Sequence, residues 1–294
     1  MRKAAAAAFF LQALIPALLR AQISNIVVTN AASFQAGLPA PGSIGTIFCT
    51  GLSVTGVVSA PGAPLPLSLS GITVTVGGAP APLFAVADLG GYQQVNFQVP
   101  LQFKWDTATA GPTAVTTMIV SQGTTTGTSV VPQVVTMGAF FRVGSTQYGL
   151  FQHSADYSLV TTSNPARVGE TIIGYGTGFD TPNPPVPAGE ATPMTPLYWV
   201  PDNLDIGVNL RRNGIYLIEG SAGKRTDVDP QFMGLAPGMV GVYQVNFVVP
   251  SVASGINIVG AEIETCNPQP FGNPCQQPGA LVMTLGPSVL LPVQ

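Results

Sequence analysis

The feature that most constrains this chain is an internal repeat. The stretch Gly-Ser-Ile-Gly-Thr-Ile-Phe-Cys-Thr-Gly-Leu at 42–52 returns as Gly-Glu-Thr-Ile-Ile-Gly-Tyr-Gly-Thr-Gly-Phe at 169–179. Likewise, Gln-Val-Asn-Phe-Gln-Val-Pro at 94–100 returns as Gln-Val-Asn-Phe-Val-Val-Pro at 244–250. A repeat of this length predicts two copies of one folding unit. No arrangement of reactive groups repeats with it, so the sequence says more about architecture than about activity.

The pattern of each copy is typical of β-structure. The chain has 34 Gly and 28 Pro, which interrupt it every few residues, and its apolar residues recur at period two. Ile72–Val76 alternates cleanly and runs into Gly77-Gly78, which predicts a strand entering a turn. Many short strands with frequent turns indicate a β-sandwich. The expected fold class is therefore all-β, with two tandem β-sandwich domains.

Further strands are predicted from the same signals. The segments 115–120 and 130–135 read as a hairpin across Gln122-Gly123-Thr124, and 256–263 with 281–285 reads as the counterpart in copy two. We expect 206–210 to be the counterpart of Ile72–Val76. Because Asn-Gly is a strong tight-turn signal, we expect the following segment 211–214 to form a turn.

The two copies differ in their insertions. Copy two is longer in Asp180–Asn203, which is rich in proline and therefore predicted to be a stiff, extended loop outside the central strands. It is also longer near Gly220–Pro237, a second expected loop, which carries charged residues. Function is often added on loops of a fixed scaffold.

The N-terminus reads as a secretory signal. Arg2 and Lys3 precede an apolar run that ends near Leu19, and Ala21 offers a small residue before the cut. We therefore expect a signal peptide at 1–21, a first domain at 22–143 and a second domain with enlarged loops at 144–294. The junction around 139–165 is too apolar for a flexible linker, so the domains are expected to pack against each other. The mature chain is expected to have no membrane span and to be secreted or held at the cell surface.

Charge argues against polyanionic partners. Without Arg2, Lys3 and Arg20, seven basic residues face 13 acidic ones, and only 8% of all residues are charged. No basic patch is available to neutralise phosphates, which disfavours nucleic-acid binding.

The three cysteines suit an oxidising compartment. Cys266 and Cys275 flank a run of turn-forming residues, and a disulfide between them would close a loop between two strands. Cys49 is left over. It lies opposite Gly176 in the repeat, so we expect a buried free thiol, with an intermolecular bridge as the alternative.

The order of motifs resembles the Solibacter-type C-terminal domain, an uncharacterised module of secreted proteins of Acidobacteria. The matching motifs in copy one are Asn30-Ala31-Ala32-Ser33-Phe34, Ala40-Pro41-Gly42-Ser43-Ile44, Phe48-x-Thr50-Gly51-Leu52 and Val95-Asn96-Phe97-Gln98-Val99-Pro100. Those in copy two are Asn164-Pro165-Ala166-Arg167-Val168-Gly169-Glu170, Tyr175-x-Thr177-Gly178-Phe179 and Val242-Tyr243-Gln244-Val245-Asn246. The repeats also resemble the immunoglobulin-like IPT/TIG class of extracellular modules. The resemblance implies an immunoglobulin-like fold and an extracellular location, and it implies no catalytic activity. The chain departs from the family at Cys49, where Gly is usual, and in its long proline-rich loop.

The repeated motifs themselves have a structural interpretation. Gly51 and Gly178 follow a strand, where a positive φ or a close backbone approach is expected. Asn96 and Asn246 follow a Gln on the same strand, and we expect their amides to tie strand to loop by hydrogen bonds. If these residues formed a binding site, both copies would carry the same ligand.

Signals for catalysis and for cofactors are weak. Gly174-Tyr-Gly-Thr-Gly178 is followed by a proline-rich run, whereas a phosphate-binding loop needs a helix there. The chain has a single histidine, His153, and neighbours such as Ser154 and Asp156 on one extended segment do not converge into a triad. A hydrolase would need a cleft with converging acids, such as Glu170, Asp180 or Glu190.

Metal ligands are equally sparse. Asp227 and Asp229 share one loop, and Asp202 and Asp205 share another, which is a weak calcium signal beside Lys224 and Arg225. We expect no metal and no cofactor.

The candidate contact residues are Tyr198 and Trp199 in the proline-rich loop. Exposed aromatic residues on a stiff loop can stack on sugar rings or anchor a protein partner. The alternative is that Trp199 folds back onto the sandwich. The sequence thus predicts a structural or adhesive interaction module without catalytic activity, whose partner is an extracellular protein or glycan. A carbohydrate-binding module that serves extracellular polysaccharide use is the alternative.

Overall fold

The structure, a computed structural model, describes residues 22–103, 115–132, 138–200, 211–220, 223–266 and 281–294. The expected signal peptide at 1–21 lies outside these residues. The described residues form strands and no helix. None of them therefore forms a helix long and apolar enough to cross a membrane.

The first half of the described chain is built from two antiparallel sheets. Its strands are β1 (Ser24–Asn30), β2 (Ile44–Thr50), β3 (Val57–Ser59), β4 (Ile72–Val76), β5 (Ala79–Ala81), β6 (Leu83–Asp88), β7 (Gln93–Gln98), β8 (Val115–Gln122) and β9 (Thr125–Pro132). The sheet with the order β1-β2-β7-β6-β3 is here called the first front sheet. The sheet with the order β5-β4-β8-β9 is the first back sheet.

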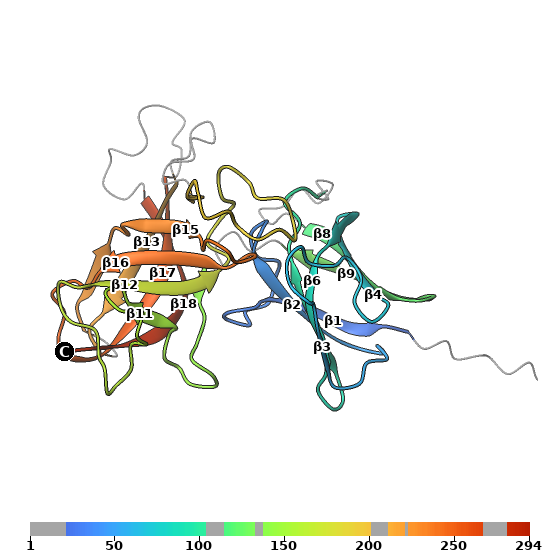
Figure 1. Cartoon of the computed structure of the whole chain (residues 1–294), viewed down its shortest axis with the longest axis horizontal. Coiled ribbons are helices and arrows are strands. Elements are labelled where there is room, and N and C mark those ends of the chain that lie inside the picture. Colours follow the sequence, from blue (N-terminus) through green and yellow to red (C-terminus); the bar gives the residue numbers. More distant parts are fainter. Residues whose placement is uncertain (1–21, 104–114, 133–137, 201–210, 221–222, 267–280) are drawn as a thin grey trace, which may run out of the picture.

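The second half repeats this plan (Figure 1). Its strands are β10 (Ala139–Phe140), β11 (Phe151–His153), β12 (Thr171–Thr177), β13 (Arg211–Ile218), β14 (Arg225–Val228), β15 (Phe232–Leu235), β16 (Tyr243–Val248), β17 (Gly255–Cys266) and β18 (Leu281–Val293). The second front sheet has the order β10-β12-β16-β15, with β11 also paired to β12, and the second back sheet has the order β14-β13-β17-β18.

This strand order defines the fold. An immunoglobulin domain packs strands A, B, E and D in one sheet against C, F and G in the other. In chain order, β1, β2, β7 and β6 take the A, B, E and D places, and β4, β8 and β9 take C, F and G. The second half assigns β10, β12, β16 and β15, then β13, β17 and β18, to the same places. Both halves are immunoglobulin-like β-sandwiches, as the sequence predicts.

Each sandwich has its own hydrophobic core. Inward residues alternate with outward ones because successive side chains of a strand point to opposite faces. In β7, for example, Val95 and Phe97 are fully buried between the two sheets. The first core runs from Ile23 to Val131 and the second from Phe140 to Val293. Phe140 belongs to the second core, because β10 pairs with β12 of the second front sheet.

Several predicted elements are present. β4 enters Gly77 and Gly78, which both have positive φ, and β8 and β9 form the predicted hairpin around Gly123. β17 pairs with β18, which confirms the second predicted hairpin. Gly51 and Gly178 have φ of 95° and 87°, which confirms the expected backbone requirement.

The turn predicted in copy two is wrong. The expected turn at 211–214 is part of β13, because Asn213 and Gly214 pair with Ile263 and Glu262 of β17. Because β17 pairs continuously with these residues, the chain cannot reverse direction here. The buried residues that alternate along β13 are Ile215 and Leu217. The predicted strand 206–210 lies outside the described residues.

The expected second loop is also partly strand. Residues 225–228 form β14, which pairs with β13, and 232–235 form β15, which pairs with β16. Charged residues therefore lie on β14, the edge strand of the second back sheet, where charge disfavours pairing with a strand of another chain.

The two sandwiches lie end to end and share hydrogen bonds (Figure 1). The Thr177 hydroxyl accepts from the backbone N–H of Ile44 at 2.8 Å and donates to the Gly241 carbonyl at 2.9 Å. The Asn30 amide donates to the Thr177 carbonyl at 3.3 Å. A second contact joins the Gly189 N–H to the Gln98 side chain at 2.6 Å. These bonds fix the end of the first sandwich against the second.

Candidate binding surface

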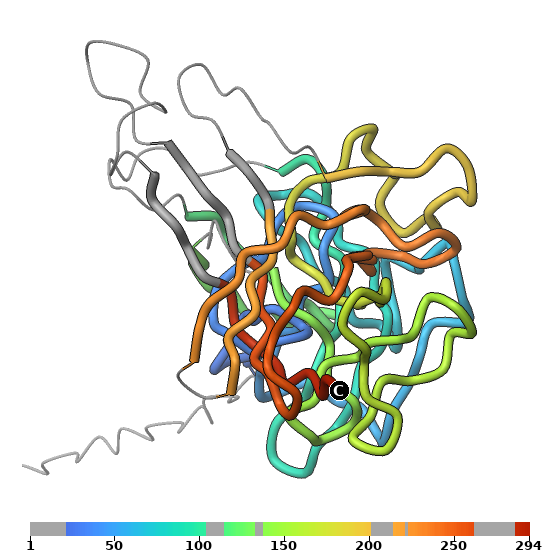
Figure 2. Tube along the Cα trace, turned by 90° about the vertical axis from the view of Figure 1, so that its left-hand side faces the viewer, coloured from blue at the N-terminus to red at the C-terminus, as the bar shows by residue number. Residues whose placement is uncertain are grey.

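The proline-rich segment carries Tyr198 and Trp199 along the edge of the second front sheet. The N–H of Leu235 donates to the Tyr198 carbonyl, and the N–H of Val200 donates to the Met233 carbonyl, both at 2.9 Å. Trp199 pairs with Gly234 as an isolated bridge. In Figure 2 this segment is part of the yellow tube at the upper right. Residues 198–200 thus extend the sheet beyond β15, at its open edge.

The structure separates the two aromatic side chains. Tyr198 is half-buried and packs against the second core. Trp199 is 44% exposed, and its ring lies 4.7 Å from that of Phe232 in an edge-to-face arrangement. Consecutive residues of an extended segment point to opposite faces, which explains why one ring turns in and the next turns out. Trp199 is therefore both packed on a buried ring and accessible.

Three other apolar side chains are exposed on the same loop and on the turn that this loop contacts. Met194 is 70% exposed, and Leu197 and Met239 are exposed as well. The loop returns to this place because both the N–H and the hydroxyl of Thr192 donate to the Met239 carbonyl at 2.9 Å. We call Met194, Leu197, Trp199 and Met239 the Trp199 patch. Thioether side chains beside an indole are adaptable contact groups.

The Trp199 side chain shares its face with polar residues of the front sheet. Trp199 pairs with Gly234, Gly234 with Gln244, and Gln244 with Tyr175. Directly paired residues point to the same face of a sheet, so these side chains form one row on its outer face.

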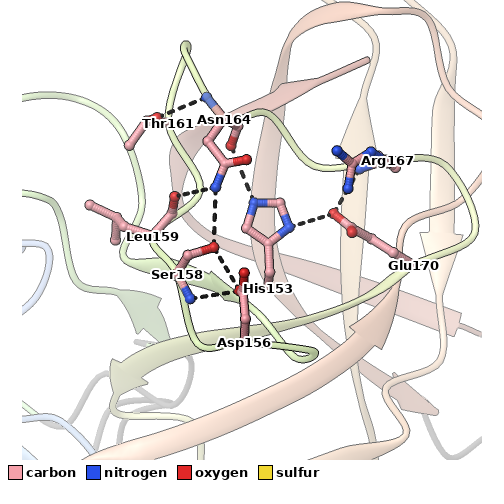
Figure 3. A network of polar contacts seen from close by, with 8 residues as sticks. All are labelled: His153, Asp156, Ser158, Leu159, Thr161, Asn164, Arg167 and Glu170. Carbon is pink, nitrogen blue, oxygen red and sulfur yellow. Dashed lines mark hydrogen bonds and ion pairs between the residues drawn. The ribbon is translucent and has the colours of Figure 1, made fainter.

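A polar network occupies the far end of the second sandwich (Figure 3). The His153 ring is buried, with Nδ1 3.0 Å from a Glu170 carboxylate oxygen and Nε2 3.2 Å from the Asn164 carbonyl. The same Glu170 oxygen accepts from the N–H of Arg167 at 2.7 Å. Both ring nitrogens therefore face oxygen atoms, one of a carboxylate and one of a backbone carbonyl.

This network does not have the geometry of a catalytic triad. The Ser158 hydroxyl donates to Asp156 at 2.7 Å, and neither residue bonds to the His153 ring. The hydrogen bonds from the Ser158 hydroxyl and from the Ser158 backbone N–H lower the pKa of the Asp156 carboxyl. The imidazole, for its part, is held between a carboxylate and a backbone carbonyl, so no hydroxyl is positioned for activation. The network stabilises the turn that leads into β12.

The other predicted sites have the following places. Within the described ranges, no three His, Cys, Asp or Glu side chains are grouped to hold a metal ion. Asp227 forms an ion pair with Arg225 at 2.6 Å along β14, while Asp202 and Asp205 lie outside the described residues. The Cys266–Cys275 pairing cannot be placed, because Cys275 lies outside the described residues.

Cys49 is a buried free cysteine on β2. Burial raises the pKa of its thiol to about 11, so the group is protonated and unreactive at neutral pH. At the equivalent position, a Cβ on Gly176 would collide with the Ala139 carbonyl oxygen, so this place in the second sandwich has little room for a side chain.

Sequence reasoning missed an exposed aromatic cluster on the first front sheet. The Phe48 ring lies 6.1 Å from that of Phe34 and 5.8 Å from that of Tyr92. Phe34 and Tyr92 are 58% and 46% exposed. A sequence signal was available, because Phe48 lies within the repeated motif 42–52, and Phe34 and Tyr92 lie shortly before the two repeated motifs.

Comparison with known proteins adds little beyond the fold. No family model matches the chain, and no curated protein matches it. Among solved structures, the chain is similar to the N-terminal Ig1-2 module of the Drosophila receptor protein tyrosine phosphatase DLAR, with 12% identity over 87% of this chain and 95% of that one, and a TM-score of 0.16. A structure titled BspA_C_WT is 9% identical over 90% of this chain and 98% of that one, with a TM-score of 0.17.

An endo-fucoidan hydrolase of glycoside hydrolase family 107 is also matched. It is 9% identical over 92% of this chain but only 37% of that one, with a TM-score of 0.17. TM-scores this low carry no argument about shared function, so the immunoglobulin-like assignment rests on the strand order described above.

Proposed function

We propose that this protein is a secreted or cell-surface interaction module without catalytic activity, which adheres to a protein partner through the Trp199 patch. The observation that carries the proposal is the accessible indole of Trp199, together with the exposed side chains of Met194 and Leu197 on the same loop and of Met239 on the turn bonded to that loop. A tryptophan supported by a buried ring is a typical anchor of a protein interface. Trp199 lies on an extended segment that is hydrogen-bonded to the sheet edge, so little ordering entropy is lost on binding.

The domain contacts support the same role. Thr177 and Gly189 each bond to the first sandwich, so the loop between them is held at both ends. A rigid pair of domains presents its loops in a fixed orientation, which suits a structural or adhesive protein. We propose domains close to 22–143 and 144–294, with the boundary moved to before Ala139.

The test is attachment of labelled protein 22–294 to cells and extracellular matrix of the source organism. We expect binding that is lost after protease treatment of the surface, that survives periodate oxidation of its sugars, and that falls at least about tenfold in Trp199→Ala. Ile256→Ala, which truncates an exposed residue of the second back sheet, serves as the matched control. Binding that is unchanged in Trp199→Ala would overturn the proposal.

A carbohydrate-binding module is the second candidate, and a specific observation favours it. Trp199, Gln244 and Tyr175 lie in one row on the outer face of the second front sheet. Aromatic rings and amides on one surface are the groups that stack on sugar rings and hydrogen-bond their hydroxyls. In the attachment assay this function predicts the opposite result, with binding lost after periodate and retained after protease.

A further inference from the structure

The same turn precedes the first repeated strand in both sandwiches. In the first, the N–H of Phe34 donates to Asn30 at 2.9 Å, and the N–H of Asn30 donates to Gln35 at 3.0 Å. In the second, Tyr157 donates to His153 at 2.9 Å, and His153 donates to Ser158 at 3.0 Å. The sequence motifs did not reveal this match, because only the alanine at the third place of the turn is common to both copies.

Each turn places an exposed aromatic ring on a left-handed backbone. Phe34 has a φ of 58° and Tyr157 a φ of 59°. This region is unfavourable for a bulky side chain and usually holds Gly, Asn or Asp. The rings do not recover this cost by burial, since they are 58% and 64% exposed. An unfavourable conformation kept in both copies at an exposed position points to a function of the ring.

A second aromatic residue accompanies each ring. Phe48 on β2 contacts Phe34, and its counterpart on β12 is Tyr175. Burial, and then the nearby Tyr157, raise the pKa of the Tyr175 phenol, in agreement with a close pair. In the first sandwich Tyr92 adds a third ring.

Amides line the same face beside the rings. Gln94 pairs with Phe48, and Gln244 pairs with Tyr175. The Gln94 amide donates to Asn96 at 2.8 Å, and the Gln244 amide donates to Asn246 at 2.9 Å. Within the described part of the chain, these bonds leave the carbonyl oxygen of each Gln and the amide NH₂ of each Asn without a protein partner. In each copy, the Gln carbonyl oxygen can accept a hydrogen bond from a ligand and the Asn amide can donate one.

We propose that these two constellations are glycan-binding sites of the same kind, one on each sandwich, which take neutral pyranose chains. The first site consists of Phe34, Phe48, Tyr92, Gln94 and Asn96, and the second of Tyr157, Tyr175, Gln244 and Asn246. Aromatic rings offer stacking for the C–H faces of a sugar, and the amides bond its hydroxyls. None of these residues is charged, which fits a neutral chain and not an acidic one. Two sites on one chain give higher avidity for a long polysaccharide than either site alone.

The first site lies on the other sandwich from Trp199, so this inference and the proposal about the Trp199 patch can fail separately. The test is binding of protein 22–294 to an array of neutral gluco-, xylo-, manno- and galacto-hexasaccharides, with oligogalacturonate as the acidic control. We expect at least one neutral glycan to bind. Phe34→Asn and Tyr157→Asn, which place a residue that tolerates the left-handed conformation, should each lower the affinity about three- to tenfold, and the double variant should abolish binding.

The controls separate loss of the site from loss of the fold. Val130→Ala truncates an exposed residue of the first back sheet and should bind like the wild type. The proposal is overturned if no neutral glycan on the array binds, if the folded double variant binds as well as the wild type, or if the double variant loses attachment to a protein partner instead of to a glycan.

Discussion

Phe34 and Tyr157 occupy the same place in the two sandwiches, on backbones whose φ angles differ by one degree, at 58° and 59°. Each ring belongs to a turn with the same hydrogen bonds, and the Phe34 ring lies 6.1 Å from that of Phe48 on the next strand. This correspondence relates the two halves more closely than their shared motifs suggest.

The backbone of Phe34 predicts that its replacement is tolerated. Phe34→Asn should leave the free energy of unfolding of the first sandwich unchanged or raise it by up to about 1 kcal/mol, because Asn accepts the left-handed region and the ring is mostly exposed. Urea denaturation checks this. Phe34→Val is the contrasting variant, because a β-branched residue is strained at this φ and should destabilise the sandwich.

His153 is expected to stabilise the far end of the second sandwich. His153→Ala removes the partner of a Glu170 carboxylate that is only partly exposed, and it leaves the Asn164 carbonyl without its bond to the ring. We expect a loss of about 2 kcal/mol in the free energy of unfolding, measured by urea denaturation. Glu170→Gln keeps an oxygen acceptor and should lose less. Equal losses in both variants would contradict this account.

Thr177 is expected to hold the two sandwiches together. Its hydroxyl accepts from Ile44 and donates to Gly241, so Thr177→Val leaves a partly buried N–H and a buried carbonyl unpaired. The loss should be about 2 kcal/mol, with a larger spread of domain orientations in small-angle X-ray scattering. Thr177→Ser keeps the hydroxyl and is the control. A compact, fully stable Thr177→Val protein would show that the hydroxyl is dispensable.

The Cys49 thiol is expected to be inert in the folded protein. Its pKa of about 11 and its burial mean that it should react with a disulfide reagent at pH 8 about two orders of magnitude more slowly than in urea. If Cys266 and Cys275 are bridged as we propose, the unfolded, unreduced chain should show one reactive thiol. Three reactive thiols would contradict the proposed disulfide between Cys266 and Cys275.

Acid titration tests the turn at Asp156. Because its pKa is lowered in the folded state, the carboxylate contributes stability above the unfolded value near 3.9, and this contribution is lost as the pH falls through the lower folded value. Carbon-detected NMR titration should place the Asp156 midpoint below that of an unfolded chain. Ser158→Ala should raise the midpoint, since the hydroxyl is the main cause. No change in Ser158→Ala would contradict the assignment.

The candidate surfaces could be predicted only in part. Trp199 and Tyr198 stand out in the sequence because aromatic residues are rare in a proline-rich loop. Which of the two is exposed depends on the pairing of residues 198–200 with β15, and no local pattern contains that information. The Asn213-Gly214 dipeptide shows the same limit, because its turn preference yields to a continuous ladder with β17.

The sequence by itself determined the fold class, the duplication and the absence of a repeated reactive group, because alternation, turn residues and repeated motifs are local signals. Only the tertiary structure decided that Asn30 and His153 are equivalent, that Phe34 and Tyr157 are exposed on a left-handed backbone, and that amides flank them on one sheet face. These relations come from strand register and backbone hydrogen bonds between distant residues. They arise when the sheets assemble, so residues with little sequence similarity come to occupy the same place.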